Sequence, residues 1–325
     1  MKVNSQSDIS FNSIYTSRTV KKGLELAASN GALFGASATV AFSAFRPISI
    51  LLTPKTEKEN RNIAAAKSIS SSIINFIIML AVSIPLAKSI KKIDDKPLKY
   101  LNARTVNLLK EKDKKLTDSK GYEFGTQIFK LGIASAAAIP KAIMTACGLP
   151  YIVNIIQSKD NKNNSIKNIS FKGKFTDKTA EGIGKIISTK RMNKFINKYK
   201  NSNFPMHITA ITDTIATLTF MHQAHKSKKI EENRKQPLIY NAGISTALSI
   251  AAGYTLDKLL DKPVEKFIDK YRKINITDKN LTKQINGIRI AKPLLILGTI
   301  YYILIPLIST FLAEKADKTK PALKR

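Results

Sequence analysis

The chain has 325 residues, a formal net charge of +31, no tryptophan and a single cysteine, Cys147, which lies among apolar residues and is expected to be buried as a small hydrophobic side chain. One cysteine excludes an intrachain disulfide. The sequence contains no phosphate-binding glycine loop, HExxH zinc motif or GxSxG nucleophile turn, so we expect no enzyme, no cofactor and no metal site. So high a positive charge is typical of proteins that meet nucleic acid or an anionic membrane, although a chain rich in Lys, Asn and Ile also follows from an A/T-rich genome.

Six stretches that are nearly free of charge predict apolar helices. They contain 126 residues but only three charged side chains, Arg46, Lys141 and Asp213. A helix in water keeps a charged face, and ~20 apolar residues are needed to cross the hydrocarbon core of a bilayer. We therefore predict an all-α, polytopic integral membrane bundle, with a soluble all-helical protein as the alternative. In chain order the stretches are 31–52, 68–87, 131–156, 204–221, 238–256 and 293–313.

Four short matches occur in the same order in both halves, and they predict an internal duplication of a three-helix unit. The offset between matched positions falls steadily, from 175 through 173 and 166 to 162, as expected if the second copy has shorter connections. The matches are Thr39 with Thr214, Glu59-Asn60-Arg61 with Glu232-Asn233-Arg234, Asp95-Lys96-Pro97 with Asp261-Lys262-Pro263, and Gly125 with Gly287.

The duplication predicts five parts of the chain. They are a polar N-terminal tail (1–19), a first three-helix membrane unit (20–157), a basic Lys/Asn-rich connector (158–203), a second three-helix membrane unit (204–316) and a basic C-terminal tail (317–325). No apolar run precedes residue 23, so we expect no removable signal peptide.

Between the apolar stretches, two kinds of feature predict shorter helices. Pro97 and Pro263 are each expected to start a helix, because a proline at the first helical position lacks only an N–H that would be unbonded anyway. Amphipathic patterns follow Pro263 and recur within 183–199 in the connector. Each is open to two interpretations: a basic helix lying on an anionic membrane, or a solvated helix packed on its own bundle.

The number of crossings is left open by the charges. Six crossings would give the two units opposite orientations, the inverted-repeat plan of many transporters, and would divide Lys and Arg almost equally between the two sides. If the third and sixth stretches instead dip in and return, most Lys and Arg fall on one side. Pro140 and Pro150 favour a broken third helix, whereas the uncharged sixth stretch favours a full span.

Ionisable groups within apolar stretches are the candidate site. A charge at the bilayer centre costs about 2.5–3.5 kcal/mol on insertion scales, so such groups are functional candidates, with a structural ion pair as the alternative. We expect Asp213, Lys141, Arg46 and Asn75 to form an intramembrane polar site, with Asp213 paired to Lys141 or Arg46. The repeated Glu-Asn-Arg sites are expected to be polar turns with an acidic residue near the next helix N-terminus. The three histidines, with no carboxylate or thiolate nearby, are a weak metal signal.

Two functions follow as hypotheses. One is a multi-pass, transporter- or channel-like protein with its site between the repeated units. The other is a non-catalytic membrane scaffold whose basic amphipathic surface helices bind anionic lipid or a protein partner. The expected partner is the lipid bilayer, with anionic lipid at the basic loops and no specific nucleic acid; self-association is left open. The composition suggests a bacterial inner-membrane protein.

Overall fold

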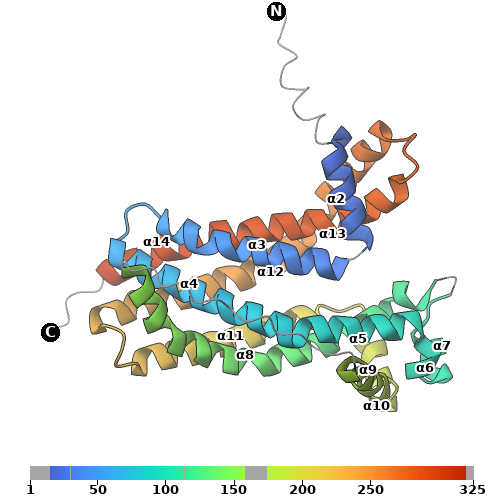
Figure 1. Cartoon of the computed structure of the whole chain (residues 1–325), viewed down its shortest axis with the longest axis horizontal. Coiled ribbons are helices and arrows are strands. Elements are labelled where there is room, and N and C mark those ends of the chain that lie inside the picture. The colour runs from blue at the N-terminus through green and yellow to red at the C-terminus, as the bar shows by residue number, and fades with distance from the viewer. Residues whose placement is uncertain (1–14, 30, 113, 158–173, 320–325) are drawn as a thin grey trace, which may run out of the picture. The chain divides into compact units, whose positions relative to one another are not determined.

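The computed structural model describes residues 15–29, 31–112, 114–157 and 174–319, and within these ranges the chain is all-helical and has no strand (Figure 1). The first half contains α2 (Arg18–Ser29), α3 (Gly31–Leu51), α4 (Lys58–Ile78), η1 (Met79–Ser83), α5 (Ile84–Asp95), α6 (Pro97–Tyr100), α7 (Ala103–Leu109), η2 (Leu116–Asp118) and α8 (Lys120–Gln157). The second half contains α9 (Lys174–Ile187), α10 (Lys190–Tyr199), α11 (Phe204–Lys226), α12 (Glu232–Ile274), α13 (Leu281–Thr299), η3 (Ile300–Leu304) and α14 (Ile305–Lys318).

Two of the longest helical runs contain a π-helical turn just before a proline. The turn η1 precedes Pro85 and the turn η3 precedes Pro306, and each proline lies in the first two positions of the following α-helix. Proline cannot donate the i→i−4 hydrogen bond, and its ring crowds the carbonyl one turn back. The wider π turn accommodates the ring, so each run continues without a break.

In the part of the chain that the structure describes, three helical runs are long and apolar enough to cross a membrane: Lys58–Asp95, Lys120–Ile155 and Leu281–Lys318. They contain the second, third and sixth stretches expected from the sequence. The first stretch coincides with α3, in which Val40–Leu51 is an apolar helical segment. The fourth and fifth stretches are helical, in α11 and α12, but are not among the three, because polar side chains, mainly Thr in the fourth and Ser, Thr and Asn in the fifth, lower their mean hydropathy.

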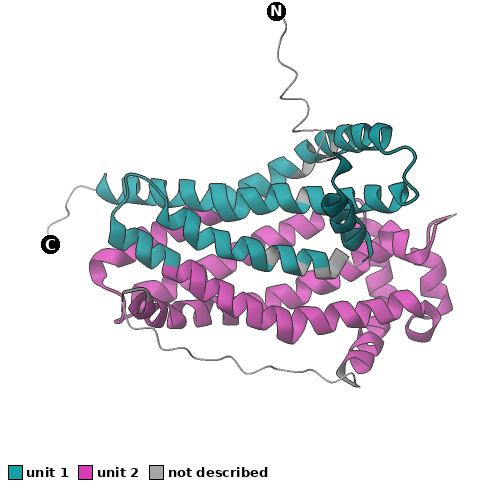
Figure 2. Ribbon diagram, turned by 45° about the horizontal axis from the view of Figure 1, so that its top comes forward, with its two compact units in different colours: residues 1–65, 247–325 teal, residues 66–246 magenta. Residues whose placement is uncertain are grey.

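The chain forms two compact units, shown in different colours in Figure 2. Unit 1 contains residues 1–65 and 247–325, and unit 2 contains residues 66–246. The boundaries fall inside α4 and α12. This division differs from the expected units 20–157 and 204–316, because each compact unit takes helices from both halves of the sequence.

In unit 1, α2 and α3 lie along α13. The backbone of α2 comes so close to α13 that a Cβ added to Gly287 would lie 2.0 Å from the Leu24 carbonyl oxygen. Further along, Gly298 faces the ring of Phe42. At one end, α2 joins the last turns of α12 and the first turns of α13 around a closed core. That core contains Tyr15, Val264, Ile268, Tyr271, Ile285 and Ile288.

Unit 2 has a larger closed core at one end of its long helices. It joins the last turns of α5, the short helices α6 and α7, the first turns of α8, and the helices α9 and α10. We call this group of elements the unit 2 head. The core residues are Leu86, Ile90, Ile93, Leu101, Leu109, Leu116, Tyr122, Phe124, Ala180, Ile183, Ile187 and Ile196.

Helices α8 and α11 run parallel. Ser135 of α8 and Thr212 of α11 are 2.7 Å apart between hydroxyl oxygens, and sixteen residues further along α8 the ring of Tyr151 lies under the Lys229 ammonium, which follows α11. Consecutive membrane crossings alternate in direction, so this pair differs from the six alternating spans expected from the sequence. The reason is that α9 and α10 return to the unit 2 head, where α8 begins, before α11 starts.

Three further expectations were wrong. The helix α8 runs unbroken through Pro140 and Pro150, so the third stretch is not a broken helix. Pro97 does start α6, but Pro263 lies inside α12, where its carbonyl accepts a hydrogen bond from Lys292. Cys147, surrounded in sequence by apolar residues and expected to be buried on that ground, is exposed on α8.

Candidate functional site

The most polar part of the apolar helices is a line of hydroxyl and charged groups between α8 and α11. Ser135 and Thr212 share a hydrogen bond, and Lys141 lies close enough to Asp213 to interact electrostatically with its carboxylate. One turn beyond Lys141, Thr145 donates a hydrogen bond to the Lys141 carbonyl. Asp213 is exposed and Lys141 is half-buried. An opposite charge nearby offsets part of the cost of placing either group among apolar side chains.

The other two candidates lie elsewhere. Asn75 is half-buried on α4, in the part of that helix that belongs to unit 2. Arg46 belongs to α3 in unit 1, where the nearby charged or polar partner is Tyr302. Of the four expected site residues, the structure therefore brings Asp213 and Lys141 together within one unit and places Arg46 in the other unit.

The two Glu-Asn-Arg sites start helices, as expected, but their central residues have different environments. Glu59 and Glu232 lie in the first turns of α4 and α12, where the helix dipole favours an acidic group. Asn60 is buried and donates a 2.8 Å hydrogen bond to Glu314. Asn233 is exposed. In the first site Arg61 donates to the Thr53 carbonyl; in the second, Arg234 lies 3.9 Å from Glu231. A shared ligand-binding role would require similar surroundings, so these sites are helix starts.

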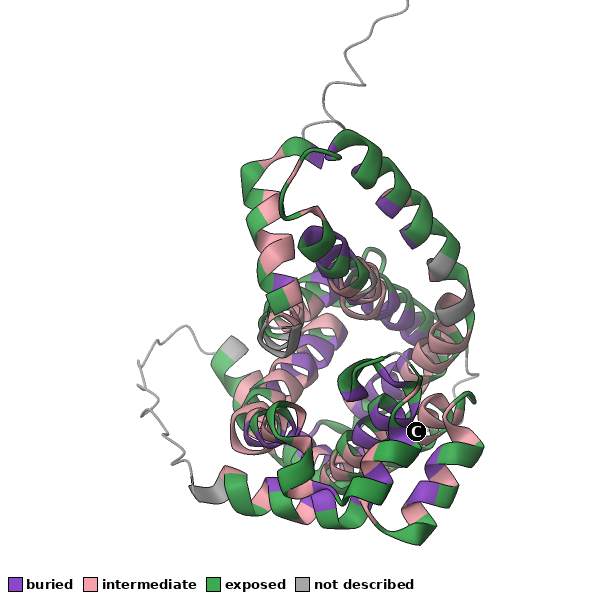
Figure 3. Cartoon of the chain, turned by 90° about the vertical axis from the view of Figure 1, so that its right-hand side faces the viewer, coloured by how far each residue is buried: buried purple, intermediate pink, exposed green. Residues whose placement is uncertain are grey.

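The amphipathic helices bury their apolar faces on their own units. In α9 and α10, Ile183, Ile187 and Ile196 have exposed fractions of 0–1 % in the unit 2 core. Ile268 and Tyr271 of α12 are fully buried in the unit 1 core. Of the two interpretations offered by the sequence, packing on the same chain is the one observed. Figure 3 shows the resulting pattern, with buried and exposed positions alternating around the helices.

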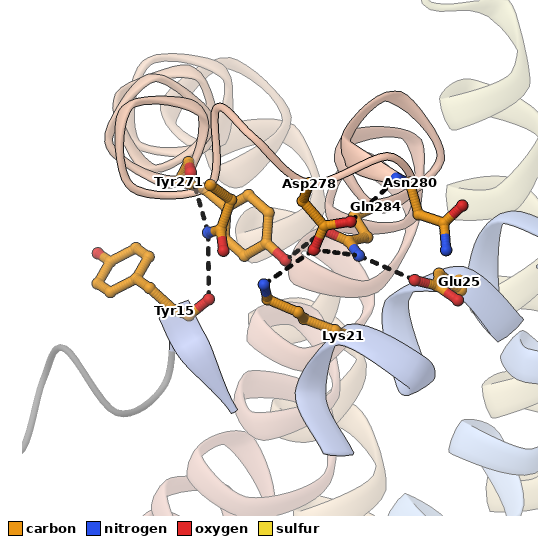
Figure 4. A network of polar contacts seen from close by, with 8 residues as sticks. Tyr15, Lys21, Glu25, Tyr271, Asp278, Asn280 and Gln284 are labelled. Atoms are coloured by element: carbon orange, nitrogen blue, oxygen red, sulfur yellow. Dashed lines mark hydrogen bonds and ion pairs between the residues drawn. The ribbon is translucent and has the colours of Figure 1, made fainter. Parts of the chain in front are cut away.

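A polar network fixes α2 to the α12–α13 connection in unit 1 (Figure 4). Gln284 is its centre: the Tyr271 hydroxyl donates to its Oε1 at 2.8 Å, while its Nε2 donates to Glu25 at 2.8 Å and to Asp278 at 3.3 Å. Lys21 forms an ion pair with Asp278 at 2.9 Å. In the same region the Asn275 amide donates to the Tyr15 and Tyr271 carbonyls.

Two pKa values in this network are shifted. The hydrogen bond from Lys21, followed by that from the Asn280 backbone, lowers the pKa of Asp278 to about 2. Burial raises the pKa of Tyr271 to about 12, and the negative charges of Asp278 and Glu25 add to the effect. Both shifts favour the protonation states that the network uses at neutral pH. Because its groups bind one another, the network is suited to holding α2 in place.

This network was not predicted from the sequence. Its members come from regions about 260 residues apart, as in the hydrogen bond between Gln284 and Glu25. One signal was present: Gln284 is a polar residue that falls between the apolar positions Leu281, Ile285 and Ile288 of a helix face. A polar residue at an inward position usually has a partner, but a pattern within one helix does not identify it.

Two further observations bear on metal and ligand binding. Among the described residues, no group of three or more His, Cys, Asp and Glu side chains is arranged to hold a metal ion. An open pocket of about 270 Å³ lies at the end of α14, lined by Lys55, Phe311, Glu314, Lys315, Lys318 and Thr319. Glu314 is already engaged by Asn60 and Lys318.

Comparisons of the chain with protein-family models, with curated proteins and with solved structures find no match.

Proposed function

We propose that this protein is a non-catalytic membrane scaffold, with apolar helices embedded in lipid and polar helical heads outside it. The main support is a difference in side-chain burial between the lysine-rich parts of the chain and the long apolar helices. The lysine-rich parts of the chain enclose compact apolar cores, as in a water-soluble domain. The long apolar helices instead expose large side chains, such as Phe76 and Ile77 at 41 and 53 % on α4. Large exposed apolar surfaces mark contact with lipid or a partner.

The exposed side chains follow the apolar stretches. On α8 they include Ile139, Ile143 and Met144, and on α14 they include Ile308, Phe311 and Leu312. A lipid environment would cover these side chains, and it is the occupant that fits helices of this length. The composition supports the bacterial inner membrane as the location.

The proposal includes an internal duplication. The matched glycines Gly125 and Gly287 lie in the third helix of each copy. Each is a point of close contact with the helix that comes just before the first helix of the other copy. A Cβ on Gly125 would lie 2.9 Å from Ile196 of α10, and one on Gly287 would meet Leu24 of α2. Ile196 and Leu24 are 172 residues apart, close to the offsets of the sequence matches. In both pairs the helix that comes just before the first helix of one copy packs on the third helix of the other.

Membrane embedding is tested by extraction of the full chain from cell membranes. Sodium carbonate at high pH and then 6 M urea remove proteins that are bound only to a membrane surface. We expect the chain to stay in the membrane pellet and to require detergent for release. Recovery as a monomer in detergent-free buffer would contradict the proposal.

A transport function is the second candidate, and the proximity of Asp213 and Lys141 is the observation that favours it. The test compares Asp213→Asn with Asp118→Asn, a matched change at an acidic residue of the short η2 turn. In reconstituted vesicles, a proton- or solute-coupled carrier would lose its flux with Asp213→Asn alone. Equal behaviour of both variants, with unchanged membrane insertion, would leave the scaffold function.

A further inference from the structure

We infer that one face of α10 binds the phosphate groups of anionic phospholipids in the membrane that holds α8 and α11. This inference rests on the proposed membrane function. The face consists of Lys190, Arg191, Lys194 and Lys198, which we call the α10 stripe. All four side chains are exposed, and residues 190–200 contain no acidic residue. At 100° per residue the four cations lie within roughly 100° of arc on one side of the helix.

The opposite face of α10 is already occupied. Ile196 is fully buried in the unit 2 core, and Phe195 and Tyr199 pack against that core. The helix therefore has no free apolar face to insert into lipid. Binding through the α10 stripe would be electrostatic, at the surface of the bilayer and not within it.

Within the described ranges, the cations of the α10 stripe are not neutralised by carboxylates, although the Lys198 ammonium lies 5.1 Å from the centroid of the Tyr199 ring. Among the described residues, the ion pairs do not include any of the four. The neighbouring helix α9 differs, since its Lys185 pairs with Glu181 at 3.0 Å and its Asp177 pairs with Lys92 at 2.7 Å. α9 thus contains acidic side chains that pair with nearby lysines, whereas residues 190–200 contain none.

The position of α10 on α8 favours anionic lipid over other polyanions as the ligand of the α10 stripe. Its Ile196 packs on α8 at Gly125, and the apolar stretch of α8 begins at Leu131. Six residues of helix advance about 9 Å, so α10 crosses α8 just outside the hydrocarbon, near the level of the headgroups. Aromatic rings mark the same level: Phe204, the first residue of α11, lies 5.0 Å from Phe195 and 4.9 Å from Tyr199 between ring centroids. Aromatic residues are typical of membrane–water interfaces, and juxtamembrane basic clusters are typical of anionic-lipid binding.

The test uses the full chain with Cys147→Ser and a single reporter, Asn197→Cys, on the exposed side of α10. The protein is reconstituted in nanodiscs of phosphatidylcholine alone or with 30 % phosphatidylglycerol, and the rate of reaction with a charged, water-soluble maleimide is measured. At low salt we expect phosphatidylglycerol to slow the reaction at least fivefold. Sodium chloride at 1 M, where the Debye length is about 3 Å, should abolish the effect.

Two variants make the test specific. The stripe variant changes all four cations to Gln. Each lost cation is expected to lower the affinity for anionic headgroups about fivefold, so phosphatidylglycerol should slow the maleimide reaction less than twofold. The control variant removes four cations from α12, whose exposed face also carries acidic residues, and should behave like the parent. Its substitutions are Lys262→Gln, Lys266→Gln, Arg272→Gln and Lys273→Gln.

The outcomes separate this inference from the proposed function. A flotation assay with lipid vesicles measures membrane association separately. If the chain floats with neutral phosphatidylcholine vesicles but position 197 gains no protection from phosphatidylglycerol, the stripe inference is overturned and the membrane function stands. If the chain floats only with vesicles that contain phosphatidylglycerol, and does so through the α10 stripe, the stripe binds anionic lipid but the membrane-embedded function is wrong. Protection of position 197 by added RNA, with none from phosphatidylglycerol, would assign the α10 stripe to nucleic acid and overturn the inference.

Discussion

The closest backbone approach in the unit 2 head is expected to make Gly184 intolerant of a single added methyl group. A Cβ at Gly184 of α9 would lie 2.1 Å from the carbonyl oxygen of Tyr100 and 2.9 Å from its carbonyl carbon. Backbone atoms do not move aside as a side chain can. Gly182, two residues earlier in the same helix, has nothing within 4 Å of the corresponding position. The pair Gly184→Ala and Gly182→Ala therefore adds the same group with and without a clash.

The magnitude follows from two terms. Both changes gain about 1 kcal/mol of helix propensity, because alanine is the better helix former. Overpacking typically costs about 1–3 kcal/mol, and only Gly184→Ala incurs it. We thus expect Gly182→Ala to stabilise α9 by about 1 kcal/mol, and Gly184→Ala to be less stable than Gly182→Ala by roughly 1–3 kcal/mol.

Hydrogen exchange of the full-length protein in detergent, followed by mass spectrometry, measures this difference in the peptides covering α9. Exchange in α9 should slow with Gly182→Ala and, relative to that variant, accelerate with Gly184→Ala. Peptides from α13 serve as the internal reference, because α13 lies wholly in unit 1 and neither change touches that unit. Equal protection of α9 in the two variants would show that α9 does not approach Tyr100 as described, and would refute the packing of the unit 2 head.

Two further predictions concern the network of unit 1 and the helix pair of unit 2. The pKa of Asp278 is held at about 2 in the folded chain, below its ordinary value of about 3.9. Its contribution to stability is therefore present above pH ~4 and is lost as the pH falls toward 2. Hydrogen exchange in α2 should report this loss, and Asp278→Asn should flatten the pH dependence. Ser135→Cys with Thr212→Cys, in a chain without the native cysteine, should form a disulfide on mild oxidation, because the two hydroxyls are 2.7 Å apart. Ser135→Cys with Thr219→Cys should not, because seven residues place the second thiol about 10 Å further along α11; the reverse result would mean a different register or direction of α11.

The helical class and the course of the apolar stretches were predictable because they depend on local composition. The stretches at 68–87, 131–156 and 293–313 coincide, to within one residue, with parts of the three described helical runs that are long and apolar enough to span a membrane. The starts of α4 and α12 at acidic residues also followed from local chemistry. By contrast, the same tripeptide starts a helix at Pro97 and continues one at Pro263, where packing on α13 holds α12 together.

The partner of an amphipathic face was not predictable. The spacing of Ile183 and Ile187 indicates that one face of α9 is covered, but lipid and protein would cover it equally well, and only the folded chain shows the unit 2 core beneath it. The proximity of Asp213 to Lys141 was expected because two opposite charges within apolar stretches favour pairing. The position of Arg46 in the other unit, like the direction of α11 relative to α8, depends on contacts between distant segments.

The parallel pair of α8 and α11 has a consequence for biosynthesis. Ser135 and Thr212 are 77 residues apart in the chain, so α8 leaves the ribosome well before its neighbour exists. At a translation rate of about 5–20 residues per second, the interval is roughly 4–15 s. During that time the side of α8 that α11 later covers is without its final neighbour, so this helix pair cannot form until the end of α11 has been synthesised.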